Sequence, residues 1–312
     1  MSRRPPPKGD QQPDLFCACF ADIPIRDQRD MMERPFFSLA KRPRHRPIEY
    51  EVRNVFVKVT PNKEHGIATI WDADVLIWAA TQITEALDRG MEPSRTLEFH
   101  PYNLLKAIRR STGGKDYERL RAALDRLSGT LVKTNIRVRG KNKKHATFHW
   151  LEGWTETIDD HTSETIVMTI TIPDWLYQGV VQAGGVLTIH EDYFLLTGGI
   201  ERWLYRVARK HAGMQDLGWQ FTMRQLYDKS GSAARFSDFA LDVRKVVKAN
   251  NLPEYTLELT KNKEGEEIVH FLRRSKLDVM HPEFEAPRAP RRRVGQGIYS
   301  ERWRPGPLVT AE

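Results

Sequence analysis

The sequence predicts an α+β fold in which one order of secondary-structure elements occurs twice along the chain. Two blocks of helical periodicity each contain three helical segments, and a pair of short alternating segments joined by a turn follows each block. The chain has 312 residues, of which 40% are hydrophobic, and this is enough to form the cores of two domains. Gly184 and Gly185 lie between the blocks and are expected to act as a hinge.

The first repeat is predicted over residues 48–183. Alternating β-branched residues indicate its strands, and Asp72 or Asp74 is well placed to begin its first helix. Gly140-Lys-Asn-Lys has the composition of a hairpin turn. The expected elements are, in order, strands at 50–60 and 67–70, helices at 72–88, 101–108 and 115–127, a hairpin at 130–151, and a strand at 165–172 that completes the sheet.

The second repeat is predicted over residues 184–280. Apolar residues recur at helical spacing from Ile200 to His211, and Thr222 is a suitable cap for the short helix that follows. The expected elements are helices at 199–212, 223–229 and 233–249 and a hairpin formed by 255–260 and 267–273. Three helices followed by a hairpin is the order of a winged helix, so the sequence predicts two winged-helix domains in tandem.

The two ends of the chain differ from the repeats in composition. Residues 1–47 contain many prolines and basic residues, and they are predicted to form a disordered arm. Residues 281–312 contain arginines among prolines and glycines, and they are predicted to form a basic disordered tail. The sequence therefore predicts flexible tails on both sides of the folded part.

The positive charge of the chain is concentrated in one segment. The whole chain carries a net charge of +8, whereas residues 106–144 contain 13 basic residues against three acidic ones, a net charge of +10. A basic segment on helix-turn-helix spacing is typical of proteins that neutralise DNA phosphates. The alternative interpretation, a solvated surface helix, loses weight because the turn before the helix and the hairpin after it are also basic.

The helix at 115–127 is predicted to read DNA bases. Its apolar residues share one face, and the basic residues on the opposite face could enter the major groove, while the hairpin tip would contact phosphates. The corresponding face of the second repeat carries both charges, and whether it binds DNA or protein stays open. The predicted DNA-binding residues are Arg109, Arg110, Ser111, Thr112, Lys115, Arg119, Ala122, Arg126, Arg137, Arg139, Lys141, Lys143, Lys144, Arg235, Lys245 and Lys248.

The sequence does not indicate catalysis, a metal site or a cofactor. The Ser-Thr-Gly-Gly-Lys segment at 111–115 lacks the spacing of a phosphate-binding loop. His145 and His149 lie on one strand, where they would be ~13 Å apart and unable to share a metal. Cys17 and Cys19 cannot form a disulfide framework, which favours a cytoplasmic protein, and the longest apolar runs fall short of the ~18–20 residues that span a membrane.

Two segments resemble the replication initiator protein A family of bacterial plasmids. They are Pro35-Phe-Phe-Ser-Leu-Ala-Lys41 and Ile70-Trp-Asp-Ala-Asp-Val-Leu-Ile-Trp78, and the tandem winged-helix order agrees with them over residues 30–275. The resemblance implies a sequence-specific protein that binds repeats in double-stranded origin DNA and opens the origin so that the host helicase is loaded. It also implies a protein associated with the nucleoid or plasmid, with a homodimer as one possible state. It supplies no catalytic residues.

A short peptide in the arm resembles the sliding-clamp-binding pentapeptide of bacteria. In Gln12-Pro-Asp-Leu-Phe16 the contacts with the clamp would come from Gln12, Leu15 and Phe16, although Pro13 departs from the usual Leu or Met. Two other functions fit the same fold. One is a winged-helix transcription regulator, and the other is a protein-interaction module.

Overall fold

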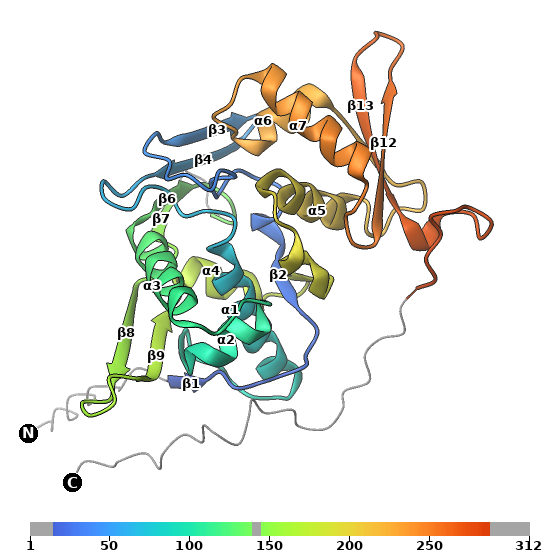
Figure 1. Ribbon diagram of the computed structural model, residues 1–312. Coiled ribbons are helices and arrows are strands. Elements are labelled where there is room, and N and C mark those ends of the chain that lie inside the picture. The colour runs from blue at the N-terminus through green and yellow to red at the C-terminus, as the bar shows by residue number, and fades with distance from the viewer. Residues whose placement is uncertain (1–14, 139–144, 288–312) are drawn as a thin grey trace, which may run out of the picture.

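The computed structural model describes residues 15–138 and 145–287, and these residues form a mixed α+β fold (Figure 1). Helices and strands are combined in four sheets within the described residues. The buried apolar side chains of these residues form one continuous core that includes both predicted repeats. Hairpins β8–β9 and β12–β13, defined below, project at opposite ends of the molecule (Figure 1).

The first unit is built on a long buried helix. The side chains of helix α1 are almost all buried, since it lies between other elements. Strand β5 pairs with β9, and β9 pairs with β8, so the first strand of the unit lies beside the last. The elements of this unit are α1 (Ala73–Asp88), β5 (Thr96–Phe99), α2 (Pro101–Ala107), α3 (Gly114–Gly129), β8 (Gly153–Ile158) and β9 (Thr165–Thr171).

The second unit repeats this arrangement. Its first strand also pairs with its last, in the order β11-β13-β12. Thr222 accepts a hydrogen bond from the backbone of Gln225 and begins the short helix, as the sequence predicts. The elements are α5 (Gly199–His211), β11 (Trp219–Thr222), α6 (Met223–Ser230), α7 (Phe236–Ala249), β12 (Tyr255–Lys261) and β13 (Glu267–Arg273).

The hairpin predicted at 130–151 belongs to a different sheet. Its strands β6 (Leu131–Thr134) and β7 (Ala146–His149) extend the pair β3 (Ile48–Val52) and β4 (Val55–Thr60), in the order β3-β4-β6-β7. Val59 lies opposite Val132, and both are buried. The expectation that this hairpin belongs to the sheet of the first unit is therefore wrong, and within that sheet β8–β9 corresponds to β12–β13 of the second unit. Alternation predicts which face of a strand is buried, but it does not identify the neighbouring strand.

The prediction of a disordered arm is wrong for residues 15–47. Strand β1 (Leu15–Cys17) pairs in parallel with β5, and β2 (Arg26–Gln28) pairs with β10 (Val186–Thr188). This segment also buries Phe16, Phe20, Met31, Met32, Phe36 and Phe37. Fully burying side chains of this size contributes roughly 1.5–3 kcal/mol each, which offsets the entropy that the segment loses.

The connection between the units is ordered by its contacts. Helix α4 (Asp174–Val181) precedes β10, and the 3-10 helix η2 (Glu191–Leu195) leads into α5. The backbone N–H of Arg29 donates to the Gly185 carbonyl oxygen, and a Cβ at Gly185 would meet the Gly179 carbonyl oxygen at 2.0 Å. The segment predicted as a hinge is thus packed against its surroundings. The predicted C-terminal tail begins with residues 281–287 in contact with the second unit through Glu283 and Asn250.

Two aspartates at the start of α1 hold the surrounding helices. Asp72 accepts two hydrogen bonds from Arg126 of α3, with N···O distances of 2.7 and 2.8 Å. Asp74 is fully buried and pairs with Arg202 of α5 at 2.7 Å and with Arg110, after α2, at 3.2 Å. A buried carboxylate is stable only with such partners, so α1 couples the first unit to the second.

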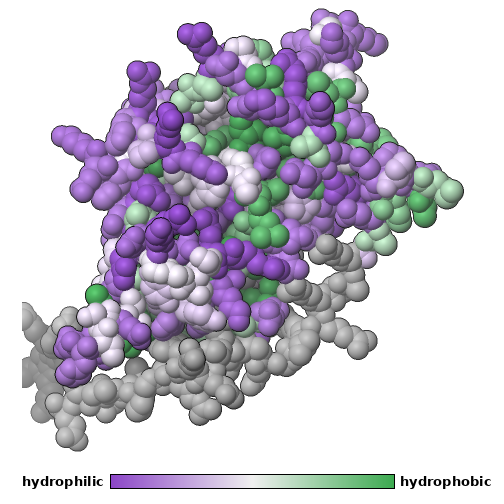
Figure 2. All heavy atoms as spheres, viewed as in Figure 1, coloured by the Kyte–Doolittle hydropathy of each residue, from purple (hydrophilic) through white to green (hydrophobic). Residues whose placement is uncertain are grey.

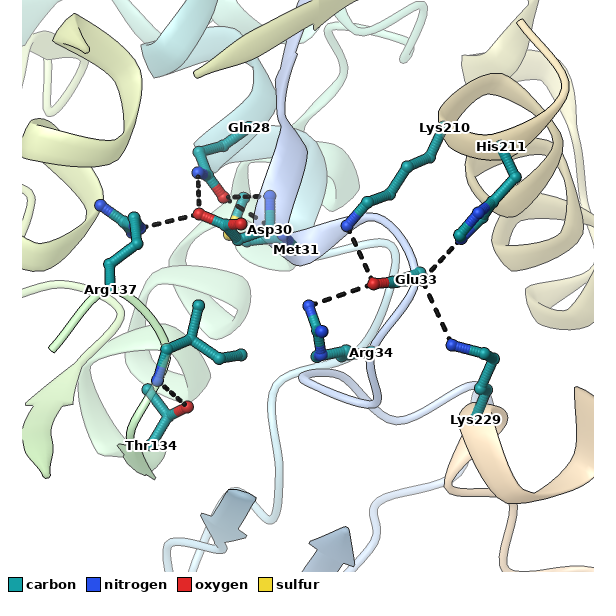
Figure 3. A network of polar contacts seen from close by, with 11 residues as sticks. Gln28, Asp30, Met31, Glu33, Arg34, Thr134, Arg137, Lys210, His211 and Lys229 are labelled. Carbon is teal, nitrogen blue, oxygen red and sulfur yellow. Dashed lines mark hydrogen bonds and ion pairs between the residues drawn. The ribbon is translucent and has the colours of Figure 1, made fainter. Parts of the chain in front are cut away.

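The N-terminal segment makes a second connection between the units. Asp27 and Arg206 of α5 form a fully buried pair with N···O distances of 2.7 and 3.0 Å. Glu33 contacts Lys210 at 3.0 Å and His211 at 2.5 Å on α5, and Lys229 on α6 at 3.2 Å (Figure 3). Residues assigned to a disordered arm therefore anchor the second unit.

Replacing Asp74 with Asn should destabilise the whole protein. The substitution leaves the buried Arg202 without its counter-charge, and we expect the free energy of unfolding to fall by about 3–5 kcal/mol. Urea denaturation measures this change. Asp242→Asn is the matched control, because Asp242 pairs with Lys245 at the surface, and it should cost less than about 1 kcal/mol. Equal effects of the two variants would contradict the role given to Asp74.

Glu33 should make stability depend on pH. Burial raises the pKa of this carboxyl, but the hydrogen bond from His211 and the charges of Lys210 and Lys229 outweigh burial and hold the pKa far below 4.5. A lowered folded pKa stabilises the fold above the unfolded pKa, and this contribution is lost as the pH falls toward the folded pKa.

Glu33→Gln should consequently lower the free energy of unfolding by about 3 kcal/mol at pH 7, with a difference that shrinks below about pH 4. Urea denaturation across this pH range tests the expectation. Glu264→Gln, in an exposed turn, should leave the pH profile as in the wild type. A constant difference between wild type and Glu33→Gln at every pH would refute it.

Candidate nucleic-acid interface

Helix α3 is docked by its apolar face, as the sequence predicts. Leu120, Leu124 and Leu127 are buried against the core. The helix begins after Gly113, whose backbone is extended, and a Cβ at Gly113 or Gly114 would meet nothing within 4 Å. The N-terminal end of α3 and its opposite face are thus open to a partner.

Two cations on the exposed face of α3 are available for binding. Lys115 is exposed, and no carboxylate among the described residues pairs with it. The Arg119 side chain is 69% exposed and contacts Asp116 at 3.0 Å. An exposed pair of this kind is worth about 1 kcal/mol or less, so a phosphate or a base can replace it. Ala122 lies one turn further along and is partly exposed.

Arg126 has a structural role instead of the predicted base contact. Its side chain is only 24% exposed, and both of its bonds to Asp72 are directed into the protein. The hydrogen bonds that the guanidinium donates to the Asp72 carboxylate raise its pKa further. The prediction is wrong here because helical periodicity cannot show that a carboxylate of α1 lies beside this face.

The turn before α3 also contains paired charges. Arg110 contacts the buried Asp74, and Arg109 contacts Glu191 at 2.8 Å. The backbone of Arg109 is left-handed, with a φ of 58°. The Ser111 hydroxyl donates to the Asp116 carboxylate, and this hydrogen bond is the main reason that the pKa of Asp116 is lowered. Thr112 is exposed. Of the predicted turn residues, Thr112 is the one that remains open to a phosphate.

Arg137 is not available to DNA. Its guanidinium lies 4.0 Å from the centre of the Trp175 ring and 2.7 Å from Asp30, and the side chain is 17% exposed (Figure 3). This prediction is therefore wrong, because the turn after β6 packs against Trp175 of α4. Arg139, Lys141, Lys143 and Lys144 lie outside the described residues.

Hairpin β8–β9 is acidic at its turn. The turn between β8 and β9 contains Asp159, Asp160 and Glu164, and all three face solvent at least in part. Negatively charged carboxylates repel phosphates, so this turn is a poor phosphate contact. The basic hairpin residues of the sequence prediction thus belong to hairpin β6–β7, whereas the acidic turn belongs to hairpin β8–β9.

The second unit presents a mixed face. Arg235 precedes α7 and is exposed, and Lys248 is exposed near its end. Lys245 pairs with Asp242 at 2.9 Å. The charges on this face nearly cancel, as the sequence indicates, and the structure does not favour DNA over protein for it.

The predicted clamp-binding peptide is only partly exposed. Leu15 is exposed, but Phe16 is 5% exposed and packs against Phe20 in the core. Gln12 lies outside the described residues. The expectation that a disordered arm offers Phe16 to a clamp is wrong for this conformation, because β1 would have to leave the sheet.

A cavity of about 550 Å³ lies beside α3. The residues that line it include Arg110, Arg119, Arg126, Lys41 and Leu195. Apolar residues reach the surface in the middle of the face shown in Figure 2, surrounded by hydrophilic residues. Lys41 begins a basic loop that the sequence prediction placed in the disordered arm, although its run of cations was visible.

No cluster of His, Cys, Asp or Glu within the described residues could hold a metal ion. In the same part of the chain, every helix is too short or too polar to cross a lipid bilayer.

Comparison with known proteins relates this fold to others. Domains 2 and 3 of RctB give a TM-score of 0.57 at 12% sequence identity, and the likeness covers 76% of this chain and 94% of that chain. A second structure of the RctB domains 2-3 gives a TM-score of 0.49 at 12% identity over 77% of this chain and 95% of that chain. The first likeness places the protein in a class of two-unit α+β folds.

The family follows from sequence. The family model described as Replication initiator protein A matches residues 26–257. A protein of Wigglesworthia glossinidia brevipalpis named "Putative replication protein" is 34% identical over 235 residues, which cover 75% of this chain and 84% of that protein. The chain belongs to the replication initiator protein A family. Its role is in the initiation of DNA replication, and membership implies that it binds DNA.

The two predicted base-reading arginines should respond differently to substitution. Arg126→Gln breaks the pair with Asp72 and should lower the free energy of unfolding by about 2 kcal/mol. Arg119→Gln should change it by less than about 0.5 kcal/mol, because Arg119 lies at the surface. Urea denaturation of both variants provides the comparison. A stable Arg126→Gln variant would show that this arginine is free after all.

Proposed function

We propose that both units are winged helices and that the protein binds repeats in double-stranded origin DNA in a sequence-specific manner. In this proposal α3 enters the major groove, and binding promotes opening of the origin and loading of the helicase. The protein acts by binding, without chemistry of its own. Family membership supports the role in replication, and the repeated order of elements supports the winged-helix assignment.

One observation carries the DNA-binding part of the proposal. The exposed face of α3 offers Lys115 and Arg119 beside an open helix N-terminus, while the other side of the helix is anchored in the core. A rigid helix with exposed arginine and lysine can read guanine in the major groove. The corresponding face of α7 is nearly neutral, so the first unit is the main anchor.

Removing the two exposed α3 cations should weaken specific binding. We expect Lys115→Gln/Arg119→Gln to reduce affinity for origin repeats by about tenfold or more and to relax base preference at one or two positions. Fluorescence anisotropy with origin and scrambled duplexes measures both effects. The control variant Arg29→Gln/Arg53→Gln removes two exposed arginines elsewhere and should retain the preference of the wild type.

Unchanged origin binding by Lys115→Gln/Arg119→Gln would remove α3 from the interface. A plasmid that carries only this gene and its flanking DNA tests the replication role directly, since an initiator should sustain it. Tight promoter binding without maintenance of that plasmid would identify a transcription regulator instead.

A further inference from the structure

The loop at Lys41–Arg46 carries uncompensated positive charge. Its sequence is Lys-Arg-Pro-Arg-His-Arg, without any carboxylate. Lys41, Arg42 and Arg46 are exposed, and no carboxylate within the described residues forms an ion pair with them. The arginines of the 106–138 segment differ in this respect, because each of them contacts a carboxylate: Arg109, Arg110, Arg119, Arg121, Arg126 and Arg137.

Arg44 holds the loop in a defined conformation. The Arg44 guanidinium donates to the carbonyl oxygens of Arg46 at 3.0 Å and Pro47 at 3.1 Å. The backbone carbonyl oxygen of Arg44 accepts a hydrogen bond from the backbone N–H of Ile67 at 2.9 Å. Because the loop backbone is ordered before it binds, little backbone entropy would be lost when Arg42 and Arg46 contact a partner.

The loop lies between the helix pair α2–α3 of the first unit and the helix pair α6–α7 of the second unit. On one side, Lys41 and Pro43 line the cavity together with Arg110 and Arg119, close to the start of α3. On the other side, the Arg44 guanidinium donates to the carbonyl oxygen of Gly231 at 2.5 Å, in the turn between α6 and α7. The basic loop therefore lies beside the start of α3 and contacts the turn that precedes α7.

We propose that the Lys41–Arg46 loop binds the phosphate backbone of duplex DNA beside the position that α3 contacts. This inference rests on the proposed function, and it adds a contact surface outside both helix pairs. Arginines attract phosphates through charge and donate several hydrogen bonds to them, and they read no base in doing so. The loop thus contributes affinity and sets the path of the duplex, while α3 contributes base preference.

The test compares Arg42→Gln/Arg46→Gln with the wild type and with the control Arg29→Gln/Arg53→Gln. Both substituted loop residues are exposed, so the fold should be retained, and thermal unfolding verifies this. We expect the loop variant to bind origin and scrambled duplexes about tenfold more weakly at physiological salt and to reduce the slope of log affinity against log salt by about two. Base preference should stay as in the wild type.

Hydroxyl-radical footprinting locates the contact. The wild type and the control should protect backbone positions next to the region that α3 protects, and the loop variant should lose this adjacent protection alone. A loop variant with wild-type salt dependence and wild-type adjacent protection would overturn the inference. If Lys115→Gln/Arg119→Gln lost binding in the same experiment, the proposed function would stand.

Two further outcomes decide against the loop as a DNA contact. Failure of the wild type to bind origin duplexes overturns the inference together with the proposed function. Vesicles that contain phosphatidylglycerol provide an anionic surface without DNA. If the loop variant lost binding to these vesicles but bound DNA like the wild type, the charge would serve a membrane surface and the inference would be wrong.

Discussion

Two carboxylates at the start of α1 determine how the rest of the molecule is arranged. Asp72 holds α3 through Arg126, and Asp74 holds both Arg110 and Arg202. A desolvated carboxylate cannot remain without counter-charge, so the helices that supply the arginines cannot move independently. The angle at which α3 is presented and the position of the second unit therefore depend on the same few hydrogen bonds. Asp27 and Glu33 in the N-terminal segment strengthen this arrangement, because they bind α5 and α6 from the other side.

This arrangement separates the cations of the protein into two groups. Arginines such as Arg126 and Arg137 neutralise buried or half-buried carboxylates and are directed inward. Lys115, Arg119 and the loop at Lys41–Arg46 face solvent. Net charge along the sequence counts both groups equally, although only the second group can exchange its water for phosphate. On α3, the surface available to DNA is consequently smaller than the 106–144 segment suggests. The same surface extends across the Lys41–Arg46 loop toward the second unit.

Much of the fold was predictable from the residues. Periodicity located α1, α2, α3, α5, α6 and α7 within a few residues, because each helix has an apolar face and recognisable ends. The partner of each strand was less accessible: β6 and β7 were expected in the sheet of the first unit, but β6 pairs with β4 in a separate sheet, and β7 pairs with β6. The N-terminal segment was misjudged because its prolines and charges outweighed its scattered phenylalanines and methionines, which are buried only once the segment packs against α1 and α5.

The sequence by itself determined the class of fold, the repeated order of elements, the basic character of one region and the likeness to an initiator family. These properties are local, since periodicity, caps and composition are set by residues close together in the chain. The tertiary structure alone decided which arginines are available and which sheet each hairpin joins. It also placed the Lys41–Arg46 loop between the two helix pairs. Those outcomes depend on contacts between residues far apart in sequence, where a single carboxylate brought close by folding changes what an arginine can bind.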